Sequence, residues 1–409
     1  MQYAHQTELL EFAGYPASFY ARLDAGMRPM IGSLLKGWSI SPEEDSGRDH
    51  QLELFVSADH VMTVRGSWIG QEYTLKDPVD GACSFIAEAL MVQANESTDN
   101  MCVHSAAAVF CGRAVLFPAR FRAGKSTLAA VLAARGLNII ADDAVHISPE
   151  AQNAISPGIS PRMRLPIPDS LARRSRTFLA AAMGLTGKRY GYLALPDNQL
   201  LTNGEPTPIG AFVYLNREPD SGSAVLTEIP KADALKTLIW QNFARQIPAG
   251  RILACLSDLV ASRPTLELRY AEAEDAADLL ESRFSTWPEE AASVSGQTLI
   301  DDDYKAIIGD PLWQAKPNII EKGLDTGHFI ADEDTGRIFH LNSTAGAIWR
   351  MLSAGEDSKF VASLLSEAFP EIESQRIKDD VVTLSQSFRE NGLLMPVDSA
   401  ISDGPTEDQ

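Results

Sequence analysis

The sequence predicts an α/β fold, and three consecutive segments between residues 100 and 143 carry this prediction. Residues 109–117 combine β-branched and aromatic side chains around a Gly-Arg turn, a pattern typical of a hairpin or strand. Residues 125–135 are rich in Ala and Leu, and their larger apolar side chains recur at helical spacing. Residues 138–143 form an apolar run that ends in two acids. Strand, helix and strand in this order predict a βαβ unit.

The segment 119–127, between the first strand and the helix, fits the phosphate-binding pattern (A/G)-x-x-x-x-G-K-(S/T). In such a P-loop, backbone N–H groups and a helix N-terminus bind polyphosphate. Lys125 is expected to reach the terminal phosphates, and the Ser126 hydroxyl is expected to contact Mg²⁺. The predicted nucleotide-binding residues are Ala119, Arg120, Arg122, Ala123, Gly124, Lys125, Ser126 and Thr127.

The loop is poor in glycine, because Ala119 stands at its first position and Arg120, Phe121 and Arg122 fill its middle. Fewer glycines leave the backbone less freedom to adopt positive φ. The two arginines either add charge-assisted contacts to phosphate or face solvent. A loop that has lost nucleotide binding is therefore an alternative to an active one.

Composition limits the classes of function. A chain of 409 residues predicts two or three domains, and 45% hydrophobic residues suffice for buried cores. A net charge of −20 argues against nucleic-acid partners and against docking to an anionic membrane. The four cysteines form no C-x-x-C pair and are expected to be reduced core thiols. Without a membrane-spanning run or a signal-peptide core, the sequence predicts a soluble cytoplasmic protein.

The pattern of elements divides the chain into five segments. We expect a mixed α/β region (1–98), the P-loop core (99–285), a polar, acidic linker (286–315), a last folded unit (316–396) and a disordered tail (397–409). Strands are predicted at 51–56, 61–64, 72–75, 210–215 and 266–270, and helices at 83–93, 231–246 and 274–283.

The last folded unit is predicted as a small winged helix. Two apolar runs, 328–331 and 336–341, flank a polar turn and indicate a hairpin. Asn342 then caps a first helix. Two further helices follow at about 357–369 and 371–391, before a terminal apolar pair.

His104, the loop ending in Lys125 and Ser126, and the acids Asp142 and Asp143 occur in an order and spacing that resemble the HPr kinase/phosphorylase superfamily, more closely its bacterial kinase-related branches. The resemblance covers residues 100–284. It implies an ATP- and Mg²⁺-dependent active site with His104, Lys125 and Asp142 as catalytic residues. Asp142 is then the base that accepts a hydroxyl proton, and Asp143 joins Ser126 at the metal. Independently, acids at a strand's carboxyl end lie where α/β sheets bind ligands.

Residues 334–342, 346–349 and 391–394 are similar to the PqqD family, the precursor-peptide recognition element of ribosomal peptide biosynthesis. This second resemblance covers residues 316–396 and implies capture of a leader peptide as an extra strand on the hairpin edge, beside the third helix. The predicted peptide-binding residues are Arg337, Ile338, Phe339, His340, Leu341, Ile377, Val381 and Leu384. The three aliphatics on the helix can equally be read as packing positions. Phe339 and Trp349 can be read as aromatic platforms for a peptide, but core positions are the favoured reading.

Together these observations predict an ATP-dependent kinase that phosphorylates a serine or other hydroxyl of a ribosomally synthesised precursor peptide. The alternative is a non-catalytic peptide-binding chaperone or scaffold with a degenerate P-loop, and a third reading is transfer to a small protein or small molecule. The expected partner is a leader-containing peptide, without nucleic acid or membrane, and the kinase resemblance leaves a homo-oligomer open. Candidate anion binders from later loops, each more often a surface charge, are Arg162, Arg164, Lys188 and Arg189.

Overall fold

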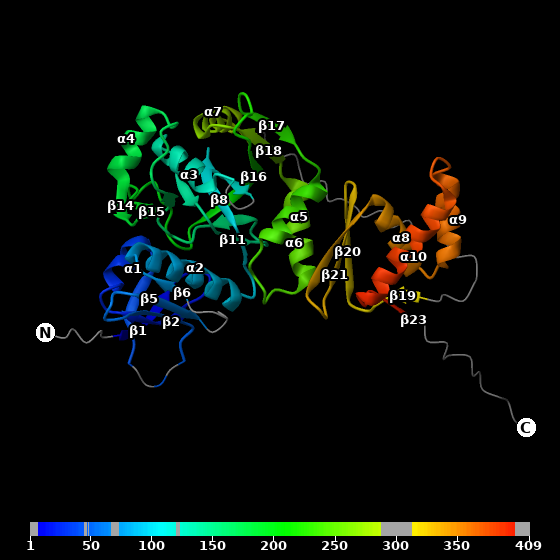
Figure 1. Cartoon of the computed structure of the whole chain (residues 1–409), viewed down its shortest axis with the longest axis horizontal. Helices are drawn as coiled ribbons and strands as arrows, with labels where there is room; N and C mark the ends of the chain where they lie inside the picture. Colours follow the sequence, from blue (N-terminus) through cyan, green and yellow to red (C-terminus); the bar gives the residue numbers. More distant parts are fainter. Residues whose placement is uncertain are drawn as a thin grey trace, which may run out of the picture. The chain divides into compact units, whose positions relative to one another are not determined.

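The structure is a computed structural model, which describes residues 7–44, 47, 49–66, 73–119, 123–287 and 313–396. The chain divides into two compact units (Figure 1). The first consists of Met1–Ile247 and Asp258–Glu289, and the second of Pro248–Ser257 and Glu290–Gln409. Helix α6 (Ala249–Ser262) belongs to both units, because its residues up to Ser257 are part of the second unit and its residues from Asp258 are part of the first. Most of the expected linker 286–315 and all of the expected tail 397–409 lie outside the described residues.

The first unit begins with a six-stranded sheet in the order β3-β1-β2-β4-β5-β6. Its elements are β1 (Thr7–Ala13), β2 (Phe19–Asp24), α1 (Arg28–Leu34), β3 (Ser39–Pro42), β4 (Leu52–Val56), β5 (Met62–Gly66) and β6 (Tyr73–Leu75). Helix α2 (Pro78–Glu96) packs against β4, β5 and β6, and its Phe85 contacts Phe12 with ring centroids 5.5 Å apart. The aromatic core therefore lies between this helix and the sheet.

The strands predicted in this region are confirmed, and the predicted helix is longer than expected. It begins at Pro78 because the Asp77 side chain accepts a hydrogen bond from the Val79 amide and caps the first turn. The sequence did not predict strand β1, because its first residues are polar and mixed in charge. Burial of Leu10 and Phe12, at alternate positions, explains why it forms.

The second sheet of this unit has the order β10-β8-β9-β16-β12-β11-β7, with β18 beside β16 and β17 beside β18. Its strands are β7 (Met101–Val103), β8 (Ser105–Phe110), β9 (Arg113–Pro118), β10 (Ile139–Ala141), β11 (Val145–Ser148), β12 (Asn153–Ile155), β16 (Pro206–Arg217), β17 (Val225–Glu228) and β18 (Thr265–Tyr270). Strand β16 runs parallel to both β9 and β18. The carboxyl ends of these three strands therefore meet at one edge of the sheet.

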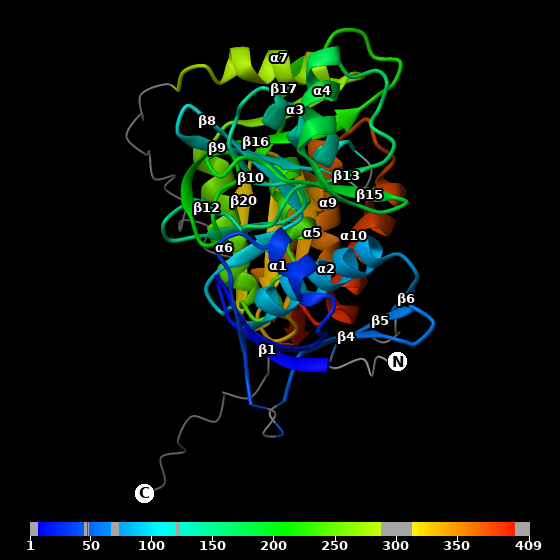
Figure 2. The same cartoon turned by 90° about the vertical axis from the view of Figure 1, so that its left-hand side faces the viewer.

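Helix α3 (Lys125–Ala134) follows β9 and is almost entirely buried. It packs against α4 (Arg173–Ala182) and α7 (Ala273–Arg283), and the three helices lie together in both views (Figures 1 and 2). The predicted hairpin β8–β9, the helix and strand β10 are confirmed. The two strands that flank α3 are parallel but are not neighbours, because β8 lies between them and is antiparallel to both.

Two smaller parts complete the first unit. A three-stranded sheet in the order β13-β15-β14 consists of β13 (Arg162–Arg164), β14 (Met183–Thr186) and β15 (Tyr190–Leu193). Strand β13 packs against α3, which brings its arginines near the start of that helix. Helix α5 (Lys231–Gln241) lies between β17 and α6 in the sequence and ends five residues earlier than predicted.

Among its described residues, the second unit contains an antiparallel sheet in the order β20-β21-β22, a strand pair β19–β23, three complete helices and the first part of α6. The elements are β19 (Trp313–Ala315), β20 (Ile319–Leu324), β21 (Gly327–Asp332), β22 (Arg337–Asn342), α8 (Ser343–Ser353), α9 (Ser358–Ala368), α10 (Ser374–Glu390) and β23 (Leu394–Pro396). Trp349 is fully buried at the centre of its core. The predicted hairpin and three helices are confirmed, and the Asn342 side chain caps α8 as expected.

No helix among the described residues is both long and apolar enough to cross a membrane.

Candidate functional site

The segment 119–127, the candidate phosphate loop, lies where β9 ends and α3 begins. Strands β16 and β18 end at the same edge, with Arg217 and Tyr270 as their last residues. Ligands of α/β sheets bind at this carboxyl edge, where loops and helix N-termini present backbone groups. Arg120 and Arg122 lie outside the described residues.

Gly124 is the N-cap of α3 and has a φ of +91°. A Cβ at this position would lie 2.5 Å from the hydroxyl oxygen of Tyr270. That hydroxyl donates a hydrogen bond of 2.8 Å to the carbonyl oxygen of Ala123. Glycine is required here by both backbone conformation and space, and Tyr270 fixes the turn that leads into the helix.

Lys125 is buried, with 7% of its surface exposed. Its Nζ donates a hydrogen bond of 3.1 Å to the carbonyl oxygen of Ala119, so the side chain folds back over the loop. Burial lowers the pKa of this amine, and the charges of Asp143 and Asp142 oppose that shift. A partly desolvated ammonium group at a helix N-terminus interacts strongly with an anion.

Asp142 follows β10 and is buried, with 5% of its surface exposed. Its Oδ2 accepts a hydrogen bond of 3.1 Å from the backbone N–H of Arg162, and its carboxyl group also pairs with the Ser126 hydroxyl. Burial raises the pKa of this carboxyl group to about 6, and the charge of Asp143 adds to the shift. Such a group changes protonation state close to neutral pH.

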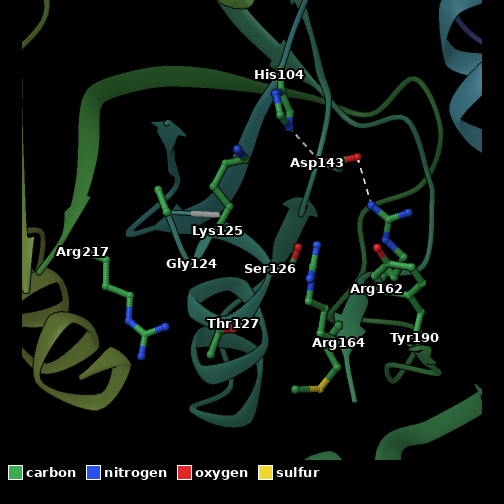
Figure 3. A pocket seen from close by; sticks show the side chains of 12 residues that line it. His104, Gly124, Lys125, Ser126, Thr127, Asp143, Arg162, Arg164, Tyr190 and Arg217 are labelled. Atoms are coloured by element: carbon green, nitrogen blue, oxygen red, sulfur yellow. Dashed lines mark hydrogen bonds and ion pairs between the residues drawn. The ribbon is translucent and has the colours of Figure 1, made fainter. Parts of the chain in front are cut away.

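Asp143 is more exposed and lies between two donors. His104 Nε2 is 3.0 Å from its Oδ1, and Arg162 Nη2 is 3.4 Å from its Oδ2 (Figure 3). Burial alone would raise the pKa of Asp143, but the hydrogen bond from His104 and the charge of Arg162 outweigh it and lower the pKa. Asp143 is therefore an anion across the physiological pH range.

Arg162 connects the site to the N-terminal part of the unit. Its guanidinium group contacts the thiol of Cys83 on α2 and lies over the ring of Tyr190, with 4.8 Å from the guanidinium carbon to the ring centroid. Burial raises the pKa of the Cys83 thiol despite the nearby positive charge, so the sulfur is a neutral contact. Packing on both sides therefore fixes the orientation of the guanidinium group toward Asp143.

These residues border a cavity of about 480 Å³, the first cavity. Four cationic side chains and one carboxylate line it: Lys125, Arg162, Arg164 and Arg217, with Asp143. Figure 3 shows Arg217 on the other side of Gly124 from Arg162 and Arg164. The remaining lining is His104, Ala123, Gly124, Ser126, Thr127, Met163 and Tyr190. An excess of positive charge around backbone N–H groups suits a polyphosphate.

The structure gathers most of the predicted site residues at the first cavity. Asp142 lies buried next to it, and Ala119 lies at a neighbouring cavity. Sequence reasoning missed Tyr190 and Arg217. Arg217 could have been found, because it lies two residues after the predicted strand 210–215, which ends at the edge where the loop lies. Tyr190 gives no such signal, because its position depends on the small sheet β13-β15-β14.

Ser126 and the paired aspartates are the groups that fit a divalent cation. Among the described residues, no three His, Cys, Asp or Glu side chains gather into a group that could hold a metal ion. Mg²⁺ needs no such group, because it is commonly bound by one or two carboxylates together with phosphate oxygens and water. One hydroxyl and two carboxyl groups in or beside a cationic cavity fit this type of site.

In the second unit, the predicted peptide-binding residues of the hairpin all lie on β22, an outer strand of its sheet. Arg337 and His340 are exposed, whereas Ile338, Phe339 and Leu341 are half-buried. Leu384 of α10 is also half-buried, and it borders the same core as Phe339 and Leu341.

Two predicted residues on α10 have a different position. Ile377 and Val381 are 6% and 1% exposed and belong to the hydrophobic core of the second unit. Their spacing of four residues places both on the inner face of the helix. They are packing positions and do not line a surface that a peptide could contact.

Residues 327–394 match the family Coenzyme PQQ synthesis protein D (PqqD). This stretch, from β21 to the first residue of β23, is a PqqD domain, a recognition element of ribosomally synthesised and modified peptides. The predicted resemblance of this region is confirmed. No curated protein matches the chain.

Several solved structures are similar to parts of the chain. A lasso peptide synthetase B1 complexed with the leader peptide is 30% identical, covering 20% of this chain and 98% of its own, with a TM-score of 0.20. TbiB1 in complex with the TbiA(beta) leader peptide is 14% identical, covering 22% and 99%, with a TM-score of 0.19. The Hpr(Ser) kinase/phosphatase from Coxiella burnetii is 12% identical, covering 44% and 91%, with a TM-score of 0.23.

Proposed function

We propose that the chain is an ATP-dependent kinase that phosphorylates a hydroxyl group, serine in the first instance, of a ribosomally synthesised precursor peptide. The observation that carries the proposal is the convergence of Lys125, Ser126 and Asp143 at a single cationic cavity, with Asp142 buried next to it and its pKa shifted in the opposite direction to that of Asp143. The same chain carries a PqqD domain, which supports a peptide as the acceptor.

Binding of the polyphosphate is assigned to the candidate phosphate loop. The N–H groups at the start of α3 and the positive charges of Lys125, Arg164 and Arg217 face the first cavity. Lys125 neutralises charge on the transferring phosphoryl group, which is the main requirement of phosphoryl transfer. In this proposal Mg²⁺ is held by Ser126 and Asp143, and when bound it neutralises charge on the phosphate oxygens.

Asp142 is the proposed base. Its raised pKa, about 6, makes it a better proton acceptor than an ordinary carboxylate while leaving it ionised at neutral pH. The acceptor hydroxyl oxygen forms a bond to the terminal phosphorus, and the bond from that phosphorus to the leaving oxygen of ADP breaks. The hydroxyl proton passes to Asp142. His104 is a positioning residue, which holds Asp143 in its charged form.

The PqqD domain is proposed to bind the leader peptide as a strand beside β22. Main-chain hydrogen bonds then give affinity, and the half-buried side chains Phe339, Leu341 and Leu384 select the sequence. Tethering the leader raises the effective concentration of the acceptor segment at the loop without any new catalytic contact.

The test is Mg²⁺-dependent transfer of the labelled terminal phosphate of ATP to a synthetic precursor. The probe is a synthetic leader-bearing peptide, chosen from the short reading frames near this gene by its binding to the PqqD domain. Lys125→Met and Asp142→Asn should each lower the transfer rate by about 10²–10³-fold. Lys359→Met and Asp275→Asn, at exposed positions on α9 and α7, are the matched controls. Retained transfer in both site variants would contradict the proposal.

The second candidate function is a non-catalytic scaffold that binds the precursor. The glycine-poor sequence of the loop, with Arg120 and Arg122 at its centre, is the observation that favours it. Calorimetry with ATP, with and without Mg²⁺, separates the two candidates. Absence of nucleotide binding together with intact leader binding would support the scaffold.

A further inference from the structure

A second cavity, of about 650 Å³, lies beside the start of the candidate phosphate loop. Pro118 and Ala119 border it where β9 ends, and Asn216 borders it near the end of β16. Helix α5 forms another wall. The cavity shares Ala123 and Arg217 with the first cavity, so the two meet at the loop.

The two cavities differ in charge. The first is lined by four cationic side chains and one carboxylate. The second is lined by two of each sign: Arg217 and Lys236, with Asp233 and Glu267. Carboxylates repel a polyphosphate, so the second cavity is suited to an occupant with little net charge. A peptide segment with a hydroxyl side chain meets that requirement, whereas a nucleotide's phosphates do not.

One face of α5 extends the second cavity. Asp233, Lys236 and Thr237 line the cavity, and Trp240 follows three to four residues later on the same helical face. Trp240 is 83% exposed. Large exposed aromatic side chains are enriched where proteins bind peptides and other proteins, because they bury much surface at small entropic cost. The cavity therefore continues into an aromatic surface.

The end of α5 is fixed beside the site. The backbone N–H of His104 donates a hydrogen bond of 2.8 Å to the carbonyl oxygen of Gln241, the residue after Trp240. At the other end of the cavity, the Nζ of Lys125 lies 3.1 Å from the carbonyl oxygen of Ala119. The second cavity thus begins at Ala119, the loop residue that Lys125 contacts. Helix α5 runs from this cavity to its last residue, Gln241, which contacts His104.

We infer that the second cavity and Trp240 form the subsite for the acceptor segment, the part of the peptide that carries the hydroxyl group. This inference rests on the proposed function, since it assumes that the terminal phosphoryl group lies at Lys125. The segment lies along α5, with an apolar or aromatic side chain against Trp240 and polar groups against Asp233 and Lys236. The leader is bound elsewhere, by the PqqD domain.

The test uses Trp240→Ala, Trp240→Phe and Lys236→Ala in the full chain, with the synthetic precursor, the leader alone and ADP as probes. Trp240→Ala should raise the KM for the precursor about tenfold, with Trp240→Phe restoring most of it. The Kd values for ADP and for the leader alone should not change. Val225→Ala, which removes an exposed apolar side chain of the same unit outside both cavities, is the matched control.

Two results would overturn the inference. An increase in the Kd for ADP with an unchanged KM for the precursor would assign the cavity to the nucleoside. Equal KM values for wild type and Trp240→Ala would remove any role for this face. If the wild-type chain transfers no phosphate, the proposed function fails. The inferred subsite is then tested by the affinity of the chain for the precursor. Weaker binding of the whole precursor, but not of the leader, by Trp240→Ala supports it, and equal binding rejects it.

Discussion

Asp142 and Asp143 are consecutive residues, yet their carboxyl groups have separate partners and opposite pKa shifts. Asp142 accepts from the backbone N–H of Arg162 at 3.1 Å, and Asp143 lies 3.0 Å from His104 Nε2. The chain turns at the end of β10, so one carboxyl group is buried and the other faces the first cavity. Of two neighbouring acids, one therefore has a pKa raised to about 6, and the other has a pKa below its ordinary value.

The first prediction concerns stability as a function of pH. In the folded chain Asp142 keeps its proton up to about pH 6, whereas in the unfolded chain it releases the proton near its ordinary pKa of 3.8. Between these values the folded state binds more protons, so the free energy of unfolding falls as pH rises. Asp142→Asn has no carboxyl group at this position, so its free energy of unfolding does not fall for this reason as pH rises. Its stability relative to wild type should therefore improve from pH 4 to pH 7, as measured by urea unfolding.

Asp143→Asn is the matched control, with the opposite sign. The lowered pKa of Asp143 contributes stability above the unfolded value, and this is lost as pH falls through the folded value. The variant should be less stable than wild type at pH 7, and the difference should shrink in acid. Differences that do not change with pH would contradict both assignments.

The second prediction concerns His104. Its hydrogen bond to Asp143 helps to hold the pKa of that carboxyl group low. In His104→Ala the pKa rises, so protons compete better with Mg²⁺ for Asp143. The half-saturating Mg²⁺ concentration for transfer should rise about tenfold or more. The rise should be larger at pH 6 than at pH 8. His104→Gln, which keeps a donor, should retain part of the affinity, and an equal loss in both variants would count against this role.

The third prediction separates two costs at Gly124. Gly124→Ala introduces both an unfavourable positive φ and a Cβ 2.5 Å from the Tyr270 hydroxyl. It should lose nucleotide binding and about 1–3 kcal/mol of unfolding free energy from the backbone alone. Gly112→Ala is the control for φ, since Gly112 has a φ of +80° and open space around its Cα.

Adding Tyr270→Phe to Gly124→Ala removes the close contact and leaves the backbone cost, but it also removes the hydrogen bond to Ala123. Stability changes of the double variant are therefore measured relative to Tyr270→Phe alone. The double variant should therefore recover stability only to the level of Gly112→Ala, as measured by thermal or urea unfolding. Full recovery of both stability and nucleotide binding would show that φ does not matter at this position.

The fourth prediction separates packing from peptide binding on α10. Ile377→Ala should lower the free energy of unfolding by about 2–5 kcal/mol, because the side chain is in the core. Leu384→Ala should weaken leader binding with a smaller effect on stability, since Leu384 is half-buried at the edge of the same core as Phe339 and Leu341. Val382→Ala, at a position 54% exposed, is the control. Fluorescence anisotropy with a labelled leader measures binding. Equal affinities for the Leu384 and Val382 variants would reject the proposed groove.

The sequence predicted features that depend on neighbouring residues. The hairpin β8–β9, helix α3 and the capping Asn342 follow from local patterns, and the structure contains them. It did not predict that β8 lies between β9 and β10, because strand order is set by pairing across the sheet. It left open whether Ile377 and Val381 pack in the core or line a peptide groove, since an apolar position on an amphipathic helix does not show which neighbour it faces.

The same limit applies to the site. The loop and the paired aspartates are short patterns with a fixed spacing, so the sequence alone is enough to predict that they belong to one site. Arg217 and Tyr190 come from segments far along the chain, and only the parallel pairing of β16 and the small sheet β13-β15-β14 brings them to the first cavity. The role of Arg162, which contacts Asp142, Asp143 and Cys83, also requires the fold.

The contact between Arg162 and Cys83 means that the boundary suggested by sequence patterns near residue 98 does not divide the folded molecule. Helix α2 supplies the surface behind the guanidinium group, and the amide of Lys36 donates to the carbonyl oxygen of Gly158 at 2.6 Å. A shortened chain that began at residue 99 would leave this arginine without its support and would expose the apolar face that α2 now covers. The N-terminal sheet and the region of the candidate phosphate loop should therefore unfold as one body, and a shortened chain meant to keep the first cavity should retain both.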